Sequence, residues 1–73
     1  MTNAQIRKAL KELKEIANSS NYDTSTFTRA VRNRFDNYIL SDYTAYTIQD
    51  CLFGASYSKD EALKEINYWL KKY

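Results

Sequence analysis

Apolar residues recur every three or four positions along most of this chain, which is the spacing of one face of an α-helix. The first stripe predicts a helix over residues 3–17, and Thr2 or Asn3 can serve as its N-cap. A second stripe predicts a helix over residues 25–40. The polar residues 18–22 between the two stripes favour a turn.

The segment 43–53 permits two predictions. Its first half, 43–48, is rich in residues that favour strands, so a strand is one alternative. We favour a helix because apolar residues in this segment also have helical spacing. Gly54 follows at the position where a helix-terminating glycine is common.

The last segment begins with Ser58 and Glu61, which have the spacing of a capping box and predict a helix start at residue 59. An apolar stripe then continues to residue 72. The chain has one glycine and no proline, so few residues force a helix to stop. We therefore predict an all-α fold, a compact bundle of four short helices in a single domain over residues 1–73.

Aromatic residues are numerous for 73 residues, with seven tyrosines, three phenylalanines and one tryptophan. Large aromatic side chains supply the buried area that a small core needs. Helical spacing assigns these aromatics to the core: Phe27, Phe35, Tyr38, Phe53, Trp69 and Tyr73. No packing role is required of Tyr22, Tyr57 and Tyr68, with Tyr43 as a further candidate.

Residues that carry catalysis are scarce. The chain has no histidine, one cysteine and no glycine-rich phosphate loop. We interpret Cys51 as a small buried hydrophobic residue, because it lacks the histidine that normally activates a cysteine. We expect no enzyme activity, no cofactor and no metal site. No apolar run is long enough to cross a bilayer and no disulfide can form, so we expect a cytoplasmic location.

Arginines beside tyrosines point to a surface that binds another protein, because both residue types are enriched at interfaces. Arg34 falls within the apolar arc of its helix, so it must extend its charged group to solvent, pair with an acid, Asp42 or Asp50, or meet a partner. The predicted partner-binding residues are Arg29, Arg32, Arg34, Tyr22, Tyr57 and Tyr68.

A basic stripe on the first helix supports an alternative function. Arg7, Lys11 and Lys14 share this stripe, and together with Arg29 and Arg32 they could follow a phosphate backbone. The alternative is a small nucleic-acid-binding regulatory protein. The net charge of +2 is nearly balanced, and no helix-turn-helix pattern is present.

In composition the chain resembles small accessory proteins of phages and mobile elements in low-GC bacteria, being short, rich in Lys, Asn, Tyr and Ile, and free of proline and histidine. Such proteins include inhibitors of bacterial defence, among them anti-CRISPR proteins. The resemblance implies a non-enzymatic inhibitory module with a protein partner. A net charge of +2 is incompatible with an acidic DNA mimic. The protein is expected to be a monomer or a homodimer.

Overall fold

The structure, a computed structural model, describes every residue from Met1 to Tyr73. Four α-helices follow one another along the chain: α1 Asn3–Ala17, α2 Thr24–Phe35, α3 Tyr43–Gly54 and α4 Lys59–Lys72. No strand is present, so the helical prediction for the third segment is confirmed and the strand alternative is wrong. The predicted fold class, a bundle of four short helices, is also confirmed.

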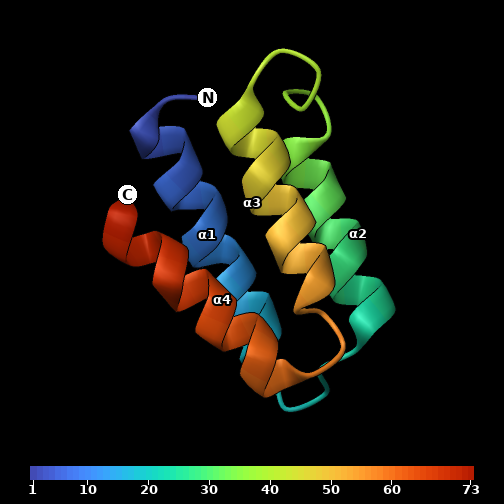
Figure 1. Ribbon diagram of the computed structural model, residues 1–73. Coiled ribbons are helices and arrows are strands. Elements are labelled where there is room, and N and C mark those ends of the chain that lie inside the picture. Colours follow the sequence, from blue (N-terminus) through green and yellow to red (C-terminus); the bar gives the residue numbers. More distant parts are fainter.

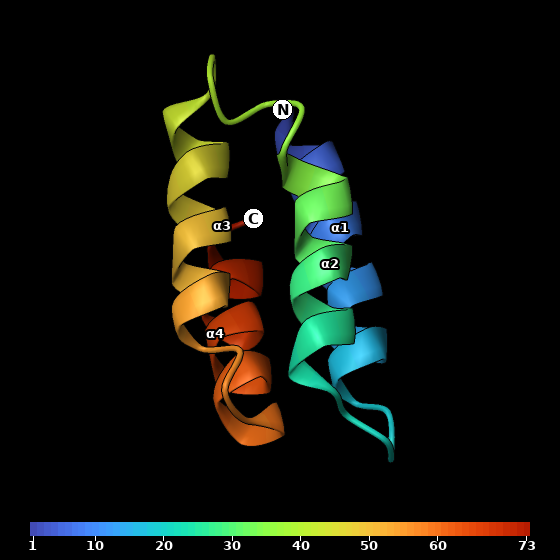
Figure 2. The ribbon, with the colours of Figure 1, turned by 90° about the vertical axis from the view of Figure 1, so that its right-hand side faces the viewer.

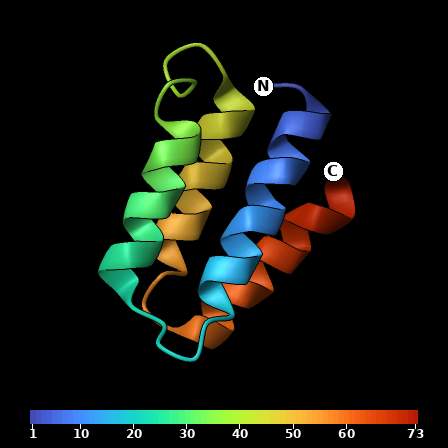
Figure 3. The ribbon, with the colours of Figure 1, turned by 180° about the vertical axis from the view of Figure 1, so that it is seen from behind.

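Successive helices run in opposite directions, and each packs against the next one along the chain (Figure 1). Helix α4 returns to lie beside α1, and this pair makes the most extensive contact of the bundle (Figure 3). The ring of contacts is therefore closed, as in an up-down four-helix bundle. Both termini lie at the same end as the turn between α2 and α3 (Figure 1).

The core is a continuous cluster of side chains from all four helices. Phe27 and Phe35 are fully buried in it, and Trp69 is 9% exposed. The predicted core positions Tyr38, Phe53 and Tyr73 are only partly buried and pack against the edge of the cluster. Spacing therefore identified side chains that contact the core but overestimated the burial of three of them.

Helix α2 ends at Phe35, so its predicted extension to residue 40 is wrong. Residues 36–41 form turns, in which the Asp42 N–H donates to the Tyr38 carbonyl at 2.8 Å. Asp36 and Asn37 favour turns over helix interiors. Tyr38 and Ile39 lie in this turn and still pack against the core. Because both contact the core, their spacing in the sequence is the same as that of a continuing helix.

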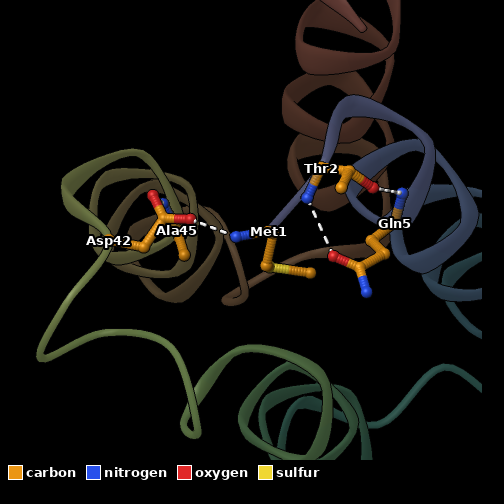
Figure 4. Close-up of polar contacts among 5 residues, drawn as sticks. All are labelled: Met1, Thr2, Gln5, Asp42 and Ala45. Carbon is orange, nitrogen blue, oxygen red and sulfur yellow. Dashed lines mark hydrogen bonds and ion pairs between the residues drawn. The ribbon is translucent and has the colours of Figure 1, made fainter.

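The reciprocal capping box lies at the start of α1 (Figure 4). The Gln5 N–H donates to Thr2 Oγ1 at 3.1 Å, and the Thr2 N–H donates to Gln5 Oε1 at 2.8 Å. At the start of α4 the Glu61 N–H donates to Ser58 Oγ, but the return bond from Ser58 to the Glu61 side chain is not formed. The capping box predicted for α4 is thus only half formed.

The start of α3 is held by Asp42 (Figure 4). Its Oδ1 accepts from the Ala45 N–H at 3.1 Å, and its Oδ2 accepts from the α-amino group of Met1 at 2.5 Å. This ion pair joins the beginning of α1 to the beginning of α3. At the other end of α3, Gly54 is helical and has no positive φ, so the predicted helix-terminating glycine conformation is absent.

Candidate functional site

The Arg34 side chain forms hydrogen bonds within the fold. Its Nε donates to Glu12 Oε1 on α1 at 3.1 Å, and its Nη1 donates to the Ala30 carbonyl at 3.0 Å. The predicted pairing with Asp42 or Asp50 is therefore wrong. Arg34 projects from the side of α2 that faces α1, and Asp42 is already occupied by the α-amino group.

Arg29 and Arg32 are exposed, and neither guanidinium group forms a hydrogen bond or an ion pair with the rest of the chain. The guanidinium carbon of Arg32 lies 5.6 Å from the centroid of the Phe53 ring on α3, within the range of a cation–π contact. This contact leaves the polar edge of the guanidinium unpaired. Both arginines are thus available to an external acceptor.

Tyr22 fastens the α3–α4 connector to the start of α2. Its hydroxyl donates to the Ser56 carbonyl at 2.5 Å, and Thr24 Oγ1 donates to the same carbonyl at 2.9 Å. The Tyr22 ring also contacts Phe27, with centroids 5.8 Å apart, and burial raises the pKa of the Tyr22 hydroxyl. The expectation that Tyr22 has no packing role is therefore wrong.

Tyr57 follows Ser56 in this connector and is 71% exposed. The connector lies at the same end of the bundle as the start of α2 (Figure 2). The contact between Arg32 and Phe53 places Arg32 on the side of α2 that faces α3. We name Arg29, Arg32, Phe53 and Tyr57 the arginine surface. Sequence spacing assigned Phe53 to the core, and only its contact with Arg32 reveals its second role.

Tyr68 lies on the other side of α3 from Arg32. It lines a hollow of about 890 Å³ between α3 and α4, together with Cys51 and Trp69. Lys72 Nζ lies 4.9 Å from the Tyr68 ring centroid, and the interaction with Tyr68 raises the pKa of Lys72. Tyr68 therefore does not join the arginine surface.

The Cys51 thiol in this hollow is half-buried. Burial, followed by the nearby charges of Glu65 and Asp50, raises its pKa above the ordinary value. A thiol with a raised pKa stays protonated at neutral pH and is a poor nucleophile. The hollow is thus lined by an unreactive thiol and by side chains of both charges, among them Lys64 and Glu65.

The side chains of the basic stripe of α1 differ in their contacts with the rest of the fold. The Arg7 Nη1 donates to the Leu70 carbonyl at 3.1 Å, so it caps the last turn of α4, whereas Lys11 and Lys14 are exposed. Arg7 lies on the side of α1 that faces α4, and Arg32 lies on the side of α2 that faces α3. The two basic sets therefore lie on different sides of the bundle.

A second exposed group lies at the end of the bundle where α2 turns into α3 (Figure 1). Leu40 is 99% exposed, Tyr43 is 82% exposed and Tyr46 is 49% exposed. We name these three residues the apolar apex. The helix predicted over residues 25–40 gave no indication that Leu40 lies exposed in a turn. The exposure of Tyr43 agrees with the expectation that no packing role is required of it.

No helix in the structure combines the length and the apolar character that a membrane span requires. No three His, Cys, Asp or Glu side chains come together in the geometry of a metal site. Comparisons with protein-family models, with curated proteins and with solved structures find no match to this chain.

Proposed function

We propose that this chain is a non-enzymatic binding module that acts on a protein partner through its arginine surface. One observation carries the proposal: Arg29 and Arg32 are exposed and unpaired beside the ring of Phe53, while Arg7 and Arg34 are bonded within the fold. Unpaired arginines beside aromatic rings are typical of the residues that dominate protein–protein binding energies.

The surroundings of these arginines favour a protein over a nucleic acid. Asp36 lies one helical turn from Arg32, and Asp50 lies one turn from Phe53, and both carboxylates are on exposed residues. Carboxylates among the cations repel phosphate groups and so weaken binding to a phosphate backbone. A protein partner can present both charges and an apolar side chain for the exposed Tyr57.

The first test is a double substitution, Arg29→Glu with Arg32→Glu, on the immobilised protein. We expect partner capture from a nuclease-treated bacterial lysate to weaken by roughly thirtyfold or more, since one hot-spot residue contributes about 2 kcal/mol. The matched control, Lys11→Glu with Lys14→Glu, makes the same change in net charge on α1 and should retain the partner. Circular dichroism should report an unchanged helix content in both variants.

The outcome separates the proposal from its alternative. Equal capture by both variants would contradict a role for the arginine surface. The alternative, a small nucleic-acid-binding regulatory protein, draws on the exposed, unpaired Lys11 and Lys14. It predicts capture that is lost on nuclease treatment, that falls steeply with salt and that fails in the lysine variant. Inhibition of a bacterial defence complex stays a prediction from composition.

A further inference from the structure

Two side-chain contacts join α2 to α3 at the arginine surface. The guanidinium carbon of Arg32 lies 5.6 Å from the centroid of the Phe53 ring. Gln49 Nε2 on α3 donates to Oδ1 of Asp36, the C-cap of α2, at 2.6 Å. In each of the two segments the contacting residues are four positions apart, so the contacts lie one helical turn apart between antiparallel helices (Figure 1). Arg32 therefore has a defined position against α3.

These contacts leave two neighbouring cations without an anion. Asp36 is the nearest acid along the helix from Arg32, but it bonds to the buried Gln49 amide and forms no ion pair with Arg32. The Phe53 ring contacts the Arg32 guanidinium and offers no oxygen acceptor to its N–H groups. Arg29 lies one helical turn before Arg32, and its guanidinium is also unpaired. The donors of both arginines are thus free for an external anion.

We propose that the arginine surface binds an acidic segment of its protein partner, with one carboxylate on Arg29 and a second on Arg32. This partner chemistry rests on the proposed function of the arginine surface in protein binding. A guanidinium presents a fork of N–H donors that matches the two oxygens of a carboxylate. Side chains three residues apart on a helix have Cβ atoms about 5–6 Å apart, so the two arginines fit two acidic side chains that are neighbours on one helix face.

The acids near the arginine surface favour carboxylates over phosphate groups as the anions of the partner. Asp36 lies one helical turn after Arg32, and Asp50 lies one turn before Phe53. A phosphorylated side chain carries a charge of about −1.5 to −2 at neutral pH, whereas a carboxylate carries a single negative charge. The two acids therefore repel a phosphate group more strongly than a carboxylate. The partly exposed Phe53 ring adds an apolar contact for the stem of an acidic side chain.

An NMR titration of the nitrogen-15-labelled protein tests the acidic partner. The probe is an alanine-rich helical peptide that carries two glutamates three residues apart, and the matched peptide carries glutamines at the same positions. The glutamate peptide should shift the Nε–H signals of Arg29 and Arg32 and the amide signal of Phe53. The glutamine peptide should bind roughly tenfold more weakly or less, because it cannot form charge-assisted hydrogen bonds. Equal affinity of the two peptides would overturn the proposal, as would tighter binding of a peptide with phosphoserine at the glutamate positions.

A pair of variants with equal changes in charge locates the binding. Arg29→Gln with Arg32→Gln should abolish the shift of the Phe53 amide, whereas Lys11→Gln with Lys14→Gln should retain it. Equal loss in both variants would overturn the proposal, because it would show attraction to the net charge alone. Capture from the lysate that depends on the two arginines, together with no binding of the glutamate peptide, would overturn the acidic partner and leave the proposed function intact.

Discussion

Gly54 is the one glycine of the chain, and its backbone does not use the freedom that glycine provides. It is the last residue of α3, and a Cβ built on it meets no atom within 4 Å. Gly54→Ala should therefore stabilise the protein by about 0.4–1 kcal/mol by restricting the unfolded chain. Thermal unfolding should show a Tm higher by roughly 2–8 °C. A lower Tm would indicate that Gly54 adopts the left-handed conformation typical of helix-terminating glycines.

Asp42 makes stability depend on pH. The hydrogen bond from the α-amino group, followed by that from the Ala45 N–H, holds the pKa of Asp42 below its ordinary value. A carboxyl group with a lowered pKa contributes stability above its unfolded pKa of about 3.9, and this contribution is lost as the pH falls through the folded value.

The variant Asp42→Asn should isolate this effect, because asparagine also serves as an N-cap while it lacks the charge. Urea unfolding should show the unchanged protein to be more stable than the variant at pH 7, with the difference shrinking below about pH 4 as Asp42 becomes protonated. Asp23→Asn isolates the part due to the α-amino group, since Asp23 also caps a helix and has a lowered pKa but binds no α-amino group, so both variants should show a pH-dependent difference. A difference between Asp42→Asn and the unchanged protein that is constant from pH 7 to pH 3 would contradict the assignment.

At the scale of the element, helices were predictable where apolar spacing and burial coincide. The starts of α1, α3 and α4 follow from caps that are visible in the sequence. The end of α2 was not predictable in this way, because Tyr38 and Ile39 pack on the core from a turn. Periodicity records which side chains are buried, and it does not record whether the backbone between them is helical.

The α2–α3 turn should be the segment that opens most readily. The amides of Ile39 and Leu40 donate to no backbone carbonyl, whereas the Asp36 and Asp42 amides on either side do. Hydrogen exchange at Ile39 and Leu40 should therefore be fast and insensitive to global stability, whereas exchange at Val31 should require unfolding. Comparable protection at Leu40 and Val31 would show instead that α2 continues to residue 40.

At the scale of the whole molecule, the candidate site was predictable only in part. Arg29, Arg32 and Tyr57 are exposed as expected from their places in the sequence. The partner of Arg34 was not predictable, because spacing within one helix cannot tell which other helix faces it; the partner is Glu12 on α1. The contact of Phe53 with Arg32 was not predictable for the same reason, although Phe53 does pack against the core as expected.

The most extensive helix contact joins α1 and α4, the first and the last helix of the chain. The contact between them forms only when the whole chain between them has been brought together, so loss of loop entropy precedes the largest gain. The bundle should consequently fold in one cooperative transition, with no stable fragment that lacks either end. A protease that removes α4 would then release an unfolded chain rather than a smaller protein.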